Sequence, residues 1–258
     1  MATLSKSTHT THTKFRLVCV LLLLLISGCA STSSVEGEPH PNDPLEPFNR
    51  AMWAINYDFL DPYLVRPVSL TYGYVMPNFA RSGVSNFLAN LDEPASVVNN
   101  LIMGNGDLAL LHLNRFWVNT TFGVAGLMDV ASRGGLVKEE ERVFSDAVGH
   151  YGVGNGWFLM IPAYGPLTTR EVTDYADNLY PPLSYLNFWA SFGKWLLEGV
   201  ETRIDLVEQE ALLENSPDPY ALTRDVYLQR RDYRADITQD IPVDQQEEDD
   251  LDAYLDDL

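Results

Sequence analysis

Cysteine, histidine and basic side chains are scarce in this chain of 258 residues, and each scarcity excludes a class of function. The three histidines that follow Cys29 lack metal-ligand spacing such as His-x-x-x-His, so nothing predicts a metal site. Lysine and arginine number 17 against 36 acidic residues, for a net charge of −19. So acidic a chain should repel nucleic acid, because basic side chains that neutralise phosphates supply most of that affinity.

Catalytic motifs are also missing. There is no Gly-x-Ser-x-Gly elbow, no lysine of a phosphate-binding Walker loop and no cysteine suited to act as a nucleophile. Adjacent acids such as Asp92-Glu93 are common in so acidic a chain, and we interpret them as solvated surface. We therefore predict that the protein is not an enzyme and that it needs no cofactor or metal.

The N-terminal segment predicts where in the cell the protein is located. Lys14 and Arg16 precede an apolar run of about ten residues, too short to cross a bilayer that needs roughly 20. The sequence Ser27-Gly28-Cys29-Ala30 follows, so residues 1–28 are predicted to be a secretory signal. It resembles a bacterial lipobox, in which Cys29 receives diacylglycerol and an acyl chain, and Ala30 favours sorting to the outer membrane. An ordinary cleaved signal with a chance cysteine is the alternative.

Three further parts follow the signal. Residues 29–42 are polar and contain proline, which is typical of a tether. Residues 43–235 are predicted to form the folded domain. Residues 236–258 end in eight acids among fifteen residues, which predicts a disordered tail. The tail either keeps the protein soluble or recruits a basic carrier.

Helix signals dominate the domain, whereas strand alternation is scarce, so the fold is predicted to be mainly α. Asp43-Pro44-Leu45-Glu46 predicts an N-cap at Asp43, and Asp218-Pro219 predicts a second helix start. Residues 198–214 have the pattern of one amphipathic helix. The proline-rich segments at 61–67 and 181–182 are predicted to break helices.

Residues 107–130 are apolar around nearly the whole circumference of a helix. A narrow polar stripe of His112, Arg115 and Asn119 interrupts them at i, i+3 and i+7 spacing. Two interpretations remain open. The helix is either a core helix with a satisfied polar seam, or a membrane-embedded helix whose stripe faces an aqueous lumen.

A glycine-rich stretch at residues 149–156 precedes the apolar run 157–161. It lacks the Gly-x-Gly-x-x-Gly spacing of a dinucleotide site. The stretch is either a tight hairpin whose glycines permit the turn, or a hinged hairpin with a mobile apolar tip.

Four arginines stand out near the C-terminal end of the domain: Arg224, Arg230, Arg231 and Arg234. They either complement a helix C-terminus and pack on neighbours, or form a docking face for phosphate headgroups or an acidic partner.

Several motifs together resemble the MlaA (VacJ) family of outer-membrane lipoproteins. They run in order over nearly all of residues 43–234 and comprise Asp43 to Arg50, Leu60 to Pro67, Ser85 to Pro94, Gly149 to Gly154, Gly193 to Arg203 and Ser216 to Tyr220. The resemblance implies a ring-shaped bundle of amphipathic helices with one glycine-rich hairpin, embedded in the outer membrane and facing the periplasm. It also implies a channel that passes mislocalised phospholipids to a periplasmic carrier, MlaC, and that works bound to trimeric porins.

The resemblance also assigns individual residues. Gly154 and Gly156 match the glycines that let the hairpin move. Asn56 and Tyr57 fall in the helix that sets the state of the channel, and Lys194 matches a lysine that faces the lumen and meets lipid phosphates. With the polar stripe of His112, Arg115 and Asn119, these are the predicted channel residues. The alternatives are a lipoprotein that only braces porins and, in a third class, a phospholipase.

Overall fold

The computed structural model describes residues 40–235, and within them the chain is mainly helical, as predicted. The elements of the first half are α2 (Glu46–Ala54), the π-helix η1 (Ile55–Val65), α3 (Arg66–Val75), α4 (Asn78–Ile102), α5 (Gly106–Phe122), α6 (Val130–Arg133) and α7 (Phe144–His150). Those of the second half are β1 (Phe158–Ile161), β2 (Gly165–Thr168), the 3-10 helices η2 (Thr169–Leu179) and η3 (Leu183–Tyr185), α8 (Phe188–Asp205), η4 (Leu206–Gln209), α9 (Glu210–Glu214) and α10 (Pro219–Arg234). None of these helices is both long and apolar enough to cross a bilayer. The predicted signal, Cys29, most of the tether and the acidic tail lie outside the described residues.

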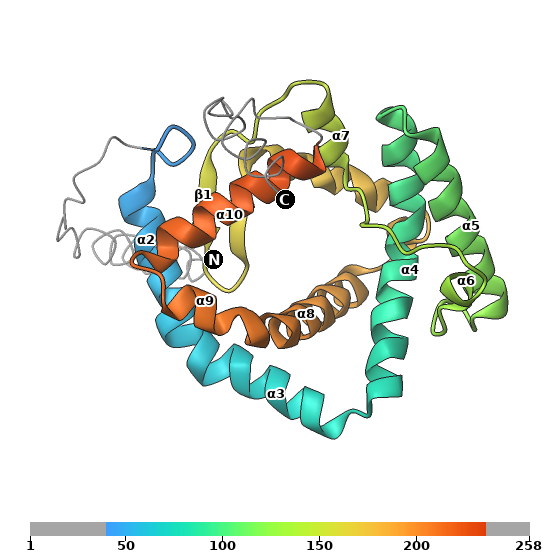
Figure 1. Ribbon diagram of the computed structural model, residues 1–258, viewed down its shortest axis with the longest axis horizontal. Coiled ribbons are helices and arrows are strands. Elements are labelled where there is room, and N and C mark those ends of the chain that lie inside the picture. The colour runs from blue at the N-terminus through green and yellow to red at the C-terminus, as the bar shows by residue number, and fades with distance from the viewer. Residues whose placement is uncertain (1–39, 236–258) are drawn as a thin grey trace, which may run out of the picture. The chain divides into compact units, whose positions relative to one another are not determined.

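The folded unit from residue 40 onward is organised as a closed sequence of neighbouring elements (Figure 1). From α2 the chain passes through η1 into α3, which packs against α8, and α8 also contacts α4. The next neighbours are α5 and α7, both packed on α4, and α7 contacts α10. The N-terminus of α10 returns to α2, where Arg50 pairs with Asp218. This closed order of neighbours is what a ring of helices requires.

The N-terminal helices differ from the prediction in two ways. Asp43 is not an N-cap, because α2 begins at Glu46, and Asp43 is buried instead as a partner of Asn49 and Tyr220. The predicted break at 61–67 is also wrong, because η1 carries the helix through Pro62. There the amide of Arg66 donates to the carbonyl of Asp61 five residues earlier, and this wider turn keeps the chain helical around a proline.

The only described strands, β1 and β2, form an antiparallel hairpin in which Phe158 pairs with Thr168 and Ile161 with Gly165. Its turn is Pro162–Tyr164, with Ala163 in the left-handed region at φ 62°. The glycines of residues 149–156 therefore do not form the turn, and that prediction is wrong. They lead into the hairpin: residue 149 belongs to α7, and the rest connect α7 to β1.

The apolar core is small and lies where the hairpin meets α10. Phe158 and Met160 point to one side of β1 and pack with Tyr220 and Leu228. The ring centroids of Phe158 and Tyr220 are 6.2 Å apart in an edge contact. Asn49 secures the same strand, because its side chain donates to the carbonyl of Phe158 and accepts from the amide of Met160.

The predicted amphipathic helix over residues 198–214 is wrong as a single element, because α8 ends at Asp205 and η4 and α9 follow. An i, i+3, i+4 pattern does not reveal a change from an α-helical to a 3-10 turn. The second helix start is confirmed. The side chain of Asp218 accepts from the amide of Ala221, and Pro219 occupies the first turn of α10.

Burial in this unit is inverted relative to an ordinary globular domain. The buried residues of the described chain include more polar or charged side chains than apolar ones. Large apolar side chains are widely exposed, among them Tyr74, Phe79 and Trp117. None of the 18 residues of α8 is buried. Many polar groups are thus buried against one another, while many large apolar side chains face outward.

Candidate functional site

The tip of the hairpin is held by the side chain of Asn56 on η1. The Asn56 Nδ2 donates to the carbonyl of Ile161 at 2.9 Å, and its Oδ1 accepts from the amide of Ala163 at 2.7 Å. Because both ends of the carboxamide are used, Asn56 fixes the turn in one orientation. The neighbouring Tyr57 points elsewhere and stacks on Trp53, with ring centroids 4.6 Å apart.

The same tip reaches α8 on its other side. Tyr164 stacks on Trp195 with ring centroids 6.2 Å apart and nearly parallel planes. The hairpin tip therefore connects η1 to α8 and links the neighbourhood of Asn56 to that of Lys194. The hairpin thus adds a link between η1 and α8, which also meet directly where Arg203 on α8 pairs with Asp61 on η1.

A row of exposed aromatic rings continues along α8 from this stack. Successive ring centroids are 5.2 to 6.2 Å apart. We call this set the aromatic row: Tyr164, Trp195, Phe192, Phe188 and Trp189. Its exposure runs from 37% at Trp195 to 75% at Trp189, so a continuous apolar strip lies open along the helix.

Lys194 lies beside the aromatic row and is paired with two carboxylates. Its Nζ is 2.8 Å from Asp92 Oδ2 on α4, and it also pairs with Glu198 one turn later on α8. Burial raises the pKa of Asp92 to about 6 against the opposing charge of Lys194. Burial lowers the pKa of Lys194, but the two carboxylates outweigh it and the net shift is upward, so the ammonium persists.

The polar stripe of α5 is buried against α4 and α6. His112 Nδ1 is 2.5 Å from Glu93, whose other oxygen accepts from Arg115. Arg115 and Asn119 both donate to Asp129 at the start of α6. With 2%, 2% and 5% exposure, His112, Arg115 and Asn119 form a buried polar seam and do not face an open lumen. Among the described residues, the His112 Nε2 atom in this seam has no hydrogen-bond partner.

Of the two interpretations of this helix, the contacts therefore support the polar seam. A role for the three residues in a channel stays a prediction, and it would act through the packing of α5 on α4. The rest of α5 exposes Leu110, Trp117 and Phe122.

The two predicted hinge glycines have different surroundings. Gly156 has φ +69°, and a Cβ there would lie 2.0 Å from Thr169 Oγ1, so only glycine fits. Gly154 has open space around it. Their predicted part in moving the hairpin stays a prediction.

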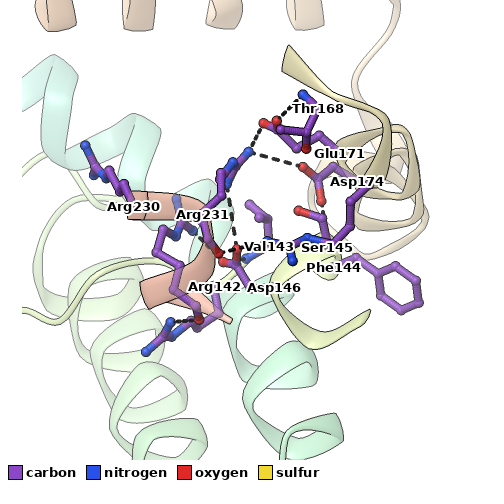
Figure 2. Close-up of polar contacts among 12 residues, drawn as sticks. Arg142, Val143, Phe144, Ser145, Asp146, Thr168, Glu171, Asp174, Arg230 and Arg231 are labelled. Atoms are coloured by element: carbon purple, nitrogen blue, oxygen red, sulfur yellow. Dashed lines mark hydrogen bonds and ion pairs between the residues drawn. The ribbon is translucent and has the colours of Figure 1, made fainter. Parts of the chain in front are cut away.

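Most of the arginines of α10 form ion pairs with buried acids, as Figure 2 shows for Arg231. Arg231 lies against Glu171 and is 3.7 Å from Asp146, and Arg234 is 2.8 Å from Asp146. Arg224 pairs with Asp43 at 3.3 Å. A docking face is therefore wrong for these three side chains.

Arg230 differs from the other three, because it is exposed on the surface and pairs with Glu140 at 3.3 Å.

Two acids of this cluster also accept hydrogen bonds from backbone amides at the starts of η2 and α7, which the sequence did not lead us to predict. Glu171 accepts from the amide of Thr168 at 2.6 Å, and Asp174 accepts from the amide of Ser145 at 2.7 Å (Figure 2). The spacing Thr168-x-x-Glu171 is a capping-box signal and was available from the sequence. The pairing of Arg231 with acids about 60 residues away had no such signal.

The site as a whole offers contacts for an amphipathic molecule. The exposed aromatic row provides apolar surface, and Lys194 with its carboxylates provides charge. The hairpin contacts this region through Tyr164 and is held on its other side by Asn56. Within residues 40–235, no three His, Cys, Asp or Glu side chains gather as metal ligands would.

Comparison with known proteins places this arrangement in a family. The family model described as MlaA lipoprotein matches residues 41–234. The intermembrane phospholipid transport system lipoprotein MlaA of Escherichia coli K12 is 43% identical over 86% of this chain and 89% of its own length. The protein of the same name from Haemophilus influenzae is 33% identical over 86% and 90%.

A solved structure described as "Structural basis for maintenance of bacterial outer membrane lipid asymmetry" matches with a TM-score of 0.73 and 49% identity. The match covers 75% of this chain and 98% of that one. The chain therefore belongs to the MlaA lipoprotein family.

Proposed function

We propose that this protein removes phospholipids that are mislocalised in the outer leaflet of the outer membrane and passes them to a carrier in the periplasm. Its relatives are named as lipoproteins of intermembrane phospholipid transport, and the similar solved structure is described in terms of outer-membrane lipid asymmetry. Retrograde transfer of this kind would keep the outer leaflet poor in phospholipid.

The inverted burial is the observation that carries the proposal. Exposed apolar patches of more than a few hundred Å² mark binding or membrane surfaces in soluble proteins. Here exposed aromatic and aliphatic side chains recur on α3, α5 and α8, whereas charged groups pair inside. A bilayer covers such a surface at no cost, because hydrocarbon is the preferred environment of those side chains.

The lipid route we propose runs along α8 beneath the hairpin. The aromatic row offers contact for acyl chains, and the charged pair of Lys194 with its carboxylates offers contact for a headgroup. A polar opening at membrane depth lowers the barrier to moving a headgroup past hydrocarbon. The route requires no bond to break, so transfer needs no catalytic residue.

The remaining assignments belong to the same proposal. Cys29 carries diacylglycerol and an acyl chain that anchor the protein in the outer membrane, with its body embedded and facing the periplasm. Trimeric porins hold it there, and an MlaC-like carrier receives the lipid. Gly154 and Gly156 permit the hairpin to move.

Deleting the gene and measuring phospholipid exposed at the cell surface tests the proposal. We expect surface phospholipid and detergent sensitivity to rise, and both to return to normal with the wild-type gene. A deletion that leaves surface phospholipid unchanged would contradict it and favour a lipoprotein that only braces porins. Fatty acid released from phospholipid by the purified protein would instead indicate a phospholipase.

A further inference from the structure

We propose that Lys194 and Glu198 form a headgroup site that favours phospholipids carrying a primary ammonium, such as phosphatidylethanolamine, over anionic phospholipids. The inference rests on the proposed function and deepens it by naming the lipid class. Lys194 alone would predict the opposite preference, for lipids with the most negative headgroups. Its surroundings reverse that expectation.

The charges around Lys194 sum to a negative site. The ammonium is shared between Asp92 on α4 and Glu198 on α8. One ammonium between two carboxylates leaves this group of side chains with a net negative charge. An additional anionic headgroup is therefore repelled.

The same geometry offers one contact for each charge of a zwitterion. An ammonium has three N–H donors, and the two carboxylates take two of them. The third is left for a lipid phosphate. The Glu198 side chain is 38% exposed, the most accessible of the pair's carboxylates, and it lies where a lipid ammonium can reach it.

The acyl chains have a surface next to this pair. Residues 194 and 198 lie one turn apart on α8, and Trp195 lies about 60° around the same helix from Glu198. Its ring is exposed and belongs to the aromatic row, which continues from it to Phe192. Headgroup contacts and acyl-chain contacts thus adjoin along one helix, which is the arrangement that a phospholipid requires.

A photocrosslinking experiment in mixed micelles tests the preference. The purified, acylated full-length protein carries benzoylphenylalanine in place of Trp195, and the micelles hold equal amounts of phosphatidylethanolamine and phosphatidylglycerol with identical acyl chains. The adducts are counted by mass spectrometry. A second probe at Trp117 on α5, which is 65% exposed and far along the chain from the pair, reports contact with bulk lipid.

We expect the probe at 195 to capture the ammonium lipid about two- to fivefold more often, the range of an exposed charge pair, and the probe at 117 to return the input ratio. E198Q should bring the ratio at 195 to the input value, whereas E198D should keep the preference because it keeps the charge. E214Q, the same change at an exposed residue of α9, should leave the ratio unchanged.

Two results would overturn the inference in different ways. Equal capture of both lipids at 195, or a preference that survives in a folded E198Q protein, removes the headgroup site and leaves the proposed function standing. Adducts at 117 but none at 195 remove the lipid route along α8 as well.

Discussion

Asn56 is the residue whose replacement should release the hairpin most selectively. In N56A the tip loses two hydrogen bonds, from Nδ2 to the Ile161 carbonyl and from the Ala163 amide to Oδ1. Each such bond contributes about 0.5–1.5 kcal/mol net, so the attached tip is destabilised by about 1–3 kcal/mol. That difference raises the detached population about 5- to 150-fold, because about 1.4 kcal/mol corresponds to a factor of ten.

Amide hydrogen exchange resolved by residue tests this role of Asn56. The Ala163 amide should exchange faster in N56A by at least this factor, because it also loses its acceptor, whereas the Met160 amide, bound by Asn49 in the core, should not change. N215A is the matched control, because the Asn215 side chain donates to the carbonyl of Ala211 in its own helix turn and does not hold the hairpin. Equal exchange of the Ala163 amide in N56A and wild type would refute the role of Asn56 in holding the hairpin tip.

Other replacements separate buried from exposed polar groups and are measured by chemical unfolding in detergent. N49A should lower the free energy of unfolding by about 2–5 kcal/mol, because the buried carbonyl of Phe158 and amide of Met160 on β1 lose their hydrogen-bond partner. R231M should cost about 3–5 kcal/mol, because it leaves the buried carboxylate of Glu171 without its ion-pair partner, whereas R230M on the surface should cost at most about 1 kcal/mol. Burial raises the pKa of Asp129, but hydrogen bonds from Ser132 and others outweigh it and bring it to about 2. Its stabilisation is thus present above the unfolded pKa of about 4 and is lost as pH falls toward 2, and D129N should remove that part of the acid dependence. Unchanged stability in R231M or an unaltered acid profile in D129N would contradict the respective assignment.

Local signals in the sequence predicted part of the fold. The cap at Asp218 is correct because an N-cap depends only on the next three residues. The same rule failed at Asp43, where a carboxylate is drawn into the core by Tyr220 and Arg224, about 180 residues away. The break expected at Pro62 failed because η1 continues through it with wider, π-helical turns, just as α4 continues through Pro94.

The candidate site could be predicted only as a set of separate positions. Asn56 and Lys194 were both identified through family motifs, but their relation to the hairpin depends on contacts with Ile161 and Trp195 that no local pattern encodes. Lys194 was expected to be available for lipid phosphates, and the sequence does not reveal that Asp92 is folded against it. The polar stripe of α5 was ambiguous for the same reason, because periodicity identifies a face but not what covers it.

Transfer of phospholipid by the purified protein is the most direct measure of the central claim. The acylated lipoprotein is placed in vesicles that contain a fluorescent phospholipid, and a lipid-free carrier of the periplasm is added outside. We expect the carrier to acquire phospholipid faster from these vesicles than from protein-free ones. Transfer at the same rate from both would contradict the account and leave a lipoprotein that binds the membrane without moving lipid.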